Sequence, residues 1–120
     1  MIPQVSPGQF SSWRDSVIAT ANTPETPFTP VLLDVREPWE VQTACVSEDG
    51  FKLLTIPMRE VPARLAELDP EQPIACICHH GMRSLQVANF LVQSGFTEVV
   101  NLQGGIDAWS QAVDPSVPRY

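Results

Sequence analysis

The stretch that decides the fold is Ile74-Ala75-Cys76-Ile77-Cys78-His79-His80-Gly81-Met82-Arg83-Ser84. Its first four residues, 74–77, are an apolar run short enough to be a buried parallel strand. After Ser84, apolar residues recur at the spacing of a helix with one apolar stripe, namely Leu85, Val87, Ala88, Leu91 and Val92. The sequence therefore predicts a strand, a loop from Cys78 to Arg83, and a helix that begins near Ser84.

Cys78 follows the predicted strand directly, and open α/β sheets place their ligand sites at the carboxyl ends of strands. The N–H groups of the loop and of the first helical turn have no partners within the helix and can point at the sulfur, where they favour negative charge. Settings of this kind lower thiol pKa values from about 8.5 to between about 3.5 and 7.5. We therefore expect a reactive thiolate at Cys78.

Length and charge limit the classes of function. The 120 residues predict one domain, with a core over about 6–113 and an irregular tail over 114–120. Seven basic against fourteen acidic residues give a formal net charge of −7, which argues against nucleic acid and anionic membranes as partners. An anionic ligand then needs local positive charge, for which Arg83, Arg36 and the loop N–H groups are the candidates.

Targeting signals are not visible in the sequence. The longest apolar runs are far shorter than the roughly 18 residues of a membrane span. Residues 1–10 have neither the basic segment nor the apolar segment of a secretory signal. We therefore expect a cytoplasmic protein with no membrane partner.

The three cysteines are an odd number in a chain without secretory context, so a disulfide framework is not expected. Cys76 and Cys78 are two residues apart and point the same way on a strand. Cys76 is predicted to be a small core residue, and the alternative is a redox partner of Cys78. Cys45 has no predicted role.

Strand and helix patterns alternate along the rest of the chain. Ser6-Pro7 marks the start of a first helix that runs to about residue 22, and the prolines of 23–30 predict a connector. Further strands are expected at 31–35, 53–56 and 98–102, and further helices at 38–43, 60–68, 84–94 and 106–113. Trp13, Trp39 and Trp109 are expected in or just beneath the core. The alternation predicts an α/β fold with a parallel sheet covered on both faces.

Four motifs taken together resemble the rhodanese family of sulfurtransferases. They are Leu33-Asp34-Val35-Arg36-Glu37, Ile56-Pro57, the Cys78-to-Arg83 loop with Ser84, and Leu102-Gln103-Gly104-Gly105-Ile106-Asp107-Ala108-Trp109. They occur in the family's order and at roughly its spacing. The resemblance implies a single rhodanese-like domain, a three-layer α/β/α fold around a five-stranded parallel sheet.

The resemblance also implies an activity, the transfer of a sulfane sulfur through a persulfide on Cys78. A small donor anion such as thiosulfate is attacked by the Cys78 thiolate and sulfite departs. A thiophilic acceptor, which is cyanide in an assay or a thiol or sulfur-carrier protein in a cell, then removes the outer sulfur. Because the intermediate is covalent, we expect no cofactor and no metal.

Active-site roles follow from the matching positions. The loop residues His79, His80, Gly81, Met82, Arg83 and Ser84 are expected to surround the outer sulfur, mainly with backbone N–H groups. Gly81 allows a backbone conformation that a side chain forbids. Arg83 either attracts the donor anion or ties the loop to acidic residues. Asp34 and Arg36, at the end of the neighbouring strand, are expected to support the loop from outside.

Other functions remain as alternatives. Related phosphatases carry a Cys-x5-Arg loop that fits phosphate, whereas this chain has Cys-x4-Arg, which suits a sulfur atom. A structural zinc site could use Cys76, Cys78, His79 and His80, although four ligands so close on a strand end cannot readily surround one tetrahedral ion. The domain could also be a non-catalytic protein-interaction or sulfur-relay module in which Cys78 is incidental.

Overall fold

The structure, a computed structural model, describes residues 2–21, 29–48 and 50–119. The predicted connector 23–30 therefore lies outside the described residues except at 29 and 30. Five strands form one parallel sheet in the order β1-β5-β4-β2-β3. They are β1 (Gln4–Val5), β2 (Val31–Asp34), β3 (Lys52–Thr55), β4 (Ile74–Ile77) and β5 (Val99–Leu102). The prediction of an α/β fold with a five-stranded parallel sheet is confirmed.

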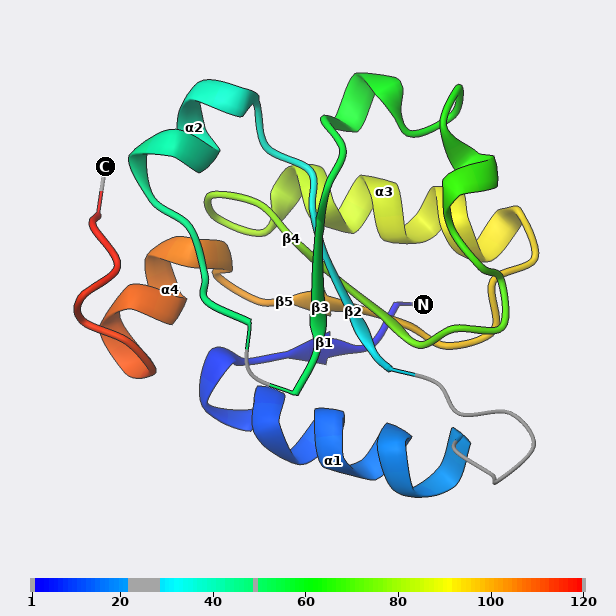
Figure 1. The fold of residues 1–120 in the computed structure, drawn as a ribbon, viewed down its shortest axis with the longest axis horizontal. Helices are drawn as coiled ribbons and strands as arrows, with labels where there is room; N and C mark the ends of the chain where they lie inside the picture. The colour runs from blue at the N-terminus through cyan, green and yellow to red at the C-terminus, as the bar shows by residue number, and fades with distance from the viewer. Residues whose placement is uncertain (1, 22–28, 49, 120) are drawn as a thin grey trace.

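Four α-helices and three short 3-10 helices accompany these strands within the described residues. The α-helices are α1 (Phe10–Ala21), α2 (Pro38–Thr43), α3 (Met82–Gln93) and α4 (Gly105–Ala112), and the 3-10 helices are η1 (Pro7–Gln9), η2 (Met58–Glu60) and η3 (Leu65–Glu67). Figure 1 shows α1 and α3 on opposite sides of the sheet. The expected three-layer arrangement is thus present.

Alternate residues of each strand face opposite sides of the sheet, so the core has two halves. On one face Leu33, Cys76 and Cys78 belong to a cluster that includes the α3 residues Val87, Ala88 and Leu91. On the other face Leu32, Ala75 and Ile77 cluster with Phe10 of α1 and with Ile106 and Trp109 of α4. Cys76 and Cys78 lie in the same cluster, as expected for residues two apart on a strand.

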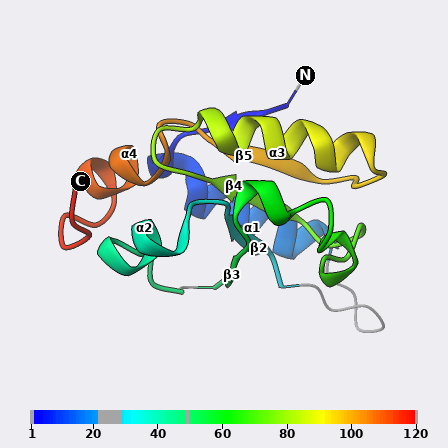
Figure 2. The ribbon, with the colours of Figure 1, turned by 90° about the horizontal axis from the view of Figure 1, so that it is seen from above.

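The order of the strands in the sheet reverses between the neighbouring strands β2 and β4. From β2 the chain continues to the edge strand β3, and from β4 it continues the other way to β5. Open α/β sheets hold ligands at the carboxyl ends of the strands beside such a switch point. Here α2, the loop after β4, and α4 each follow the carboxyl end of a strand, and Figure 2 shows α2 and α4 at the same end of the sheet.

Two predicted helices differ from the structure. The helix predicted over 60–68 is wrong, because the structure has the 3-10 helices η2 and η3 with a turn between them. Pro62 has no N–H to donate to the carbonyl of Met58, which removes an α-helical bond at that point. Val61 and Leu68 are nevertheless buried. The other helix, α3, begins at Met82 rather than near Ser84, so the loop before it is shorter than predicted.

The predicted burial of Trp39 is also wrong. Trp109 is buried and Trp13 is half-buried, but Trp39 is 62% exposed. Helix α2 is only six residues long, and the side chain that it buries is that of Glu40. Trp39 therefore lies on the outer side of this short helix.

Candidate active site

The loop after β4 lies against the start of α4. The N–H groups of Ile106 and Asp107 donate to the carbonyl oxygens of Cys78 and His79, at 2.9 and 3.2 Å. These are amides of the first helical turn, which have no partner within α4. A Cβ atom at Gly105 would lie 2.3 Å from the oxygen of Cys78 and 2.5 Å from that of His79. This position therefore has to be glycine for the loop to approach so closely.

The sulfur of Cys78 is contacted by two hydrogen-bonding groups. The N–H of Gly81 donates to Sγ over 3.1 Å, and the hydroxyl of Ser84 lies 3.3 Å from Sγ. Gly81 has a φ of +100° and forms the N-cap of α3, a conformation that other residues rarely adopt. The loop therefore closes around the sulfur, and Cys78 is only 1% exposed.

The remaining loop residues form the outer surface of the site. His79 is half-buried and His80 is exposed, and their rings stack with centroids 3.9 Å apart. Met82, the first residue of α3, is 69% exposed. The structure thus places Cys78, Gly81 and Ser84 inside the loop, and His79, His80 and Met82 at its surface.

Arg83 ties the start of α3 to α2. Its Nη1 and Nη2 donate to the two carboxylate oxygens of Glu40, at 2.7 and 2.9 Å. Glu40 is buried and also accepts the N–H of Glu37 over 3.0 Å. Of the two roles open for Arg83, the structure therefore shows the tie to an acidic residue.

Asp34 and Arg36 form a buried pair next to this contact. The Arg36 guanidinium donates to both carboxylate oxygens of Asp34 and to the backbone oxygens of Glu40 and Ala44. Arg36 is 1% exposed, so it cannot meet an anion from solvent, and its expected contribution to a positive entrance is not supported. The pair instead fixes the backbone of α2 and so positions Glu40 for Arg83.

The other two cysteines have environments unlike that of Cys78. Cys76 is fully buried, and burial together with the nearby Cys78 raises the pKa of its thiol. Burial and then the Asp34 carboxylate raise the pKa of the Cys45 thiol, although Cys45 lies at the surface. The placement of Cys76 agrees with its prediction as a core residue.

Potential metal ligands do not gather as the zinc alternative requires. Within residues 2–21, 29–48 and 50–119, the group of three or more ligating side chains close enough to share an ion is His79, His80 and Asp107. Neither Cys76 nor Cys78 belongs to this group. Asp107 is also bound by Arg119 and Gln111. The four ligands of the zinc alternative, Cys76, Cys78, His79 and His80, are therefore not brought together around one site.

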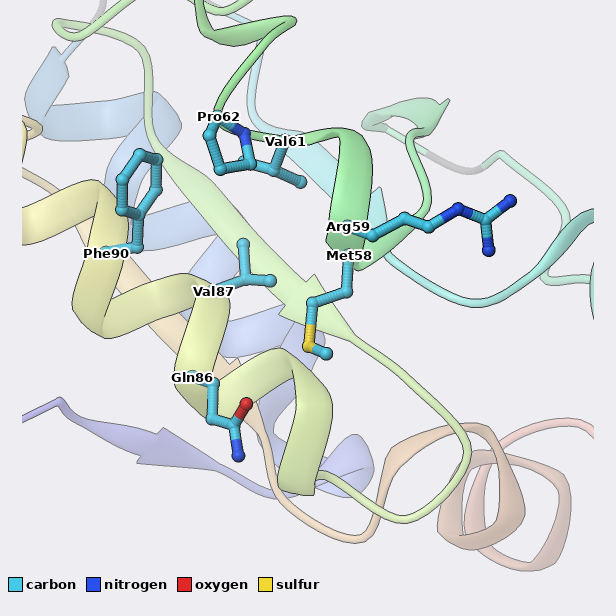
Figure 3. Close-up of a pocket in the computed structure, with 7 residues that line it drawn as sticks. All are labelled: Met58, Arg59, Val61, Pro62, Gln86, Val87 and Phe90. Carbon is cyan, nitrogen blue, oxygen red and sulfur yellow. The ribbon is translucent and has the colours of Figure 1, made fainter.

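An apolar hollow of about 240 Å³ lies between η2 and α3 (Figure 3). It is lined by Met58, Arg59, Val61, Pro62, Gln86, Val87 and Phe90. The Arg59 side chain extends away from the others (Figure 3). None of these residues belongs to the loop over 78–83, so the hollow is separate from Cys78.

Sequence reasoning missed two polar residues that contact predicted site residues, Glu40 and Asn101, and a third, Gln4, that contacts Asn101. Glu40 binds Arg83, while Asn101 of β5 binds Ser84, Gly81 and Gln4 of β1. Glu40 could have been found from its position three residues after Glu37, where it caps the start of α2. Asn101 could have been found because it is an amide in the middle of the apolar run 99–102. No pattern in the sequence indicates Gln4.

Among the described residues, no helix combines the length and the apolar character that a membrane span requires.

The sequence is similar to those of known proteins. A 93-residue alignment with the Rhodanese-like/PpiC domain-containing protein 12 of Arabidopsis thaliana is 45% identical and covers 74% of this chain. The chain spans only 30% of the length of that plant protein. The thiosulfate sulfurtransferase GlpE of Pseudoalteromonas translucida is 33% identical over 89 residues, which cover 74% of this chain and 81% of that protein.

A solved structure has the same fold over the whole length. The rhodanese-related protein of Thermoplasma volcanium superposes with a TM-score of 0.70 and 25% identity, covering 98% of this chain and 99% of that one. The family described as rhodanese-like domain matches residues 16–112, a range that includes Asp34, the loop after β4 and the start of α4. The chain therefore belongs to the rhodanese-like family, whose relatives include sulfurtransferases.

Proposed function

We propose that the protein is a sulfurtransferase that carries a sulfane sulfur as a persulfide on Cys78. The observation that supports this most directly is the arrangement around the sulfur, where Gly81 N–H and Ser84 Oγ lie 3.1 and 3.3 Å from Sγ. Hydrogen bonds of this kind stabilise a thiolate and, after transfer, the negative outer sulfur of a persulfide. The similarity to named sulfurtransferases points to the same reaction class.

The first half-reaction uses a small donor anion such as thiosulfate. The Cys78 thiolate attacks the outer sulfur of thiosulfate, and a new S–S bond forms at Sγ. The bond between the two sulfur atoms of thiosulfate breaks, and its electron pair leaves with sulfite. No cofactor is needed, because the step exchanges one S–S bond for another: the Cys78 thiolate supplies the electron pair of the new bond, and sulfite takes the pair of the broken one.

The second half-reaction returns the enzyme to its starting state. A thiolate of a small thiol or a sulfur-carrier protein, or cyanide in an assay, attacks the outer sulfur of the persulfide. The electron pair of the Cys78–sulfur bond then returns to Cys78 as a thiolate. This two-step exchange predicts ping-pong kinetics.

The backbone supplies the positive field that a donor anion needs. Helix α3 begins at Met82, directly after the loop, and a helix N-terminus attracts anions through its unpaired N–H groups. This local field offsets the net charge of −7. The two arginines expected to supply local positive charge, Arg36 and Arg83, are each paired with a carboxylate.

The three cysteines are unpaired, which fits a reducing compartment. We propose a cytoplasmic location on this basis, and the net charge of −7 argues against nucleic acid and anionic membranes as partners.

The experiment that tests the proposal is mass spectrometry of the intact protein after incubation with thiosulfate. We expect a gain of one sulfur atom, which disappears on treatment with cyanide or dithiothreitol. Cys78→Ser should show no gain and no transfer from thiosulfate to cyanide, whereas the matched variant Cys45→Ser should behave like the wild type. Substantial transfer by folded Cys78→Ser would overturn the proposal. Cys78-dependent hydrolysis of an aryl phosphate would favour the phosphatase alternative.

A further inference from the structure

Asn101 is a buried amide in a strand that is otherwise apolar. It is 1% exposed and lies between Val100 and Leu102, both of which are core residues. In the sheet, Asn101 lies beside Cys76 of β4 on one side and Gln4 of β1 on the other. Because strand residues alternate, its side chain lies on the face that carries Cys76, Cys78 and α3. Burying an amide here costs free energy unless each of its polar atoms has a partner.

The partners of Asn101 fix the orientation of its amide. Nδ2 donates to the backbone oxygen of Gly81 over 3.1 Å and to Oε1 of Gln4 over 2.8 Å. The amide oxygen of Asn101 cannot donate a hydrogen bond, so the amide nitrogen has to face the carbonyl oxygen of Gly81. Oδ1 therefore faces Ser84, whose Oγ lies 2.5 Å away.

Ser84 then has one hydrogen and two neighbours that can accept it. Its Oγ lies 2.5 Å from Oδ1 of Asn101 and 3.3 Å from Sγ of Cys78. While Cys78 is a thiol, Ser84 can donate to Asn101 and accept the S–H, so every group is satisfied. Once Cys78 is a thiolate, its sulfur and the Asn101 oxygen compete for the single Ser84 hydrogen.

We propose that Asn101 is a positioning residue that controls hydrogen-bond donation to the Cys78 sulfur through Ser84. Its oxygen competes with the thiolate for the Ser84 hydrogen. Its Nδ2 donates to the carbonyl oxygen of Gly81 and to Gln4, and these two contacts fix which way the amide faces. This inference rests on Cys78 being the nucleophile of the proposed function, but it concerns the ionisation of the thiol rather than the identity of the sulfur donor.

The test is the pH midpoint of Cys78 alkylation by iodoacetamide, measured in a Cys45→Ser background so that the surface thiol does not react. Asn101→Leu removes the competing oxygen, which frees the Ser84 hydrogen for the thiolate. We expect its midpoint to fall by about half a pH unit or more. Asn101→Asp strengthens the competing acceptor and adds a negative charge, so its midpoint should rise. The exposed Asn89→Leu, on α3, is the matched control and should leave the midpoint unchanged.

A double-mutant cycle assigns the effect to Ser84. In a Ser84→Ala background the hydroxyl is absent, so Asn101→Leu should move the midpoint by much less than it does when Ser84 is present. Three results would overturn the proposal. Asn101→Leu could shift the midpoint equally in the two backgrounds, Asn101→Leu and Asn101→Asp could shift it in the same direction, or neither variant could shift it. Alkylation needs no sulfur donor, so a failed thiosulfate assay with the expected midpoints would refute the proposed activity alone.

Discussion

Arg83 and Glu40 form a two-pronged ion pair that joins the first turn of α3 to α2. Nη1 lies 2.7 Å from Oε1 and Nη2 lies 2.9 Å from Oε2. The Glu40 side chain is 5% exposed and that of Arg83 is 33% exposed. The loop around Cys78 ends at this pair, so the pair fixes one end of the candidate active site.

Glu40→Gln should destabilise the protein by about 1–2 kcal/mol, which is less than the roughly 3–5 kcal/mol for breaking a fully buried pair, because water screens Arg83. Urea unfolding measures the change. The control is Glu67→Gln, which breaks the exposed pair of Glu67 with Arg64 and should change the midpoint very little. Equal losses in the two variants would show that the buried position of Glu40 has no special role.

Cys76→Ala should keep the sulfurtransferase activity. The pKa of the Cys76 thiol is raised by burial, so this group stays protonated and is a poor attacker of a persulfide on Cys78. Because the side chain is fully buried, its loss should cost about 1 kcal/mol in the free energy of unfolding. Steady-state transfer from thiosulfate to cyanide is the measurement. A large fall in turnover, in a variant that is still folded, would instead support a Cys76–Cys78 redox pair.

Gly105→Ala should be strongly destabilising, by about 2 kcal/mol or more. The new Cβ would meet the backbone oxygens of Cys78 and His79 at 2.3 and 2.5 Å, and backbone atoms cannot move aside as a flexible side chain can. Gly8→Ala is the matched control, since a Cβ there meets nothing within 4 Å. Thermal unfolding of the two variants checks this. A Gly105→Ala protein as stable as Gly8→Ala would show that the loop does not lie so close to α4.

Alkylation of Cys78 in the folded protein should depend steeply on the size of the reagent. Cys78 is 1% exposed, whereas Cys45 lies at the surface. We expect iodoacetamide to modify Cys78 and a bulky maleimide to modify only Cys45 within the same time, as followed by peptide mass spectrometry. Unfolding in guanidinium should remove the difference. Rapid labelling of native Cys78 by the bulky reagent would mean that the loop opens widely in solution.

Arg119→Gln should weaken the attachment of the C-terminal segment to α4 in a pH-dependent way. A hydrogen bond from Arg119 lowers the pKa of the Asp107 carboxyl. Because the folded pKa is below the unfolded one, this contact stabilises the fold above about pH 4 and is lost as the pH falls through the folded pKa. The variant should therefore be less stable than the wild type at neutral pH and equal to it in strong acid. NMR titration of Asp107 should show its pKa rising in Arg119→Gln.

The central strand, the loop and the helices on either side could be predicted because local patterns and tertiary packing agree there. The run 74–77 is buried on both faces and reads as a strand, and Pro38 opens α2 where expected. The prediction failed where a local pattern competes with packing or with a proline. The apolar spacing over 60–68 suggested an α-helix, but Pro62 interrupts its hydrogen bonds.

The edge strand β1 and the contacts of Asn101 could not be predicted for a different reason. Gln4–Val5 is two residues long and partly exposed, so it forms only because β5 offers a free edge. In the same way Arg83 had two possible roles until the structure placed Glu40 beside it. Both are decided by residues far away in the chain, which a local pattern does not contain.

The hydrogen bond between Gln4 and Asn101 joins residues 97 positions apart. During synthesis on a ribosome, the first strand leaves the exit tunnel long before its partner does. Cys78 emerges before Asn101 as well, so the nascent chain carries the Cys78 thiol for a time without the amide that lies against Ser84. The hydrogen bonds around Cys78 and Ser84 are therefore complete only when the last strand of the sheet has been made.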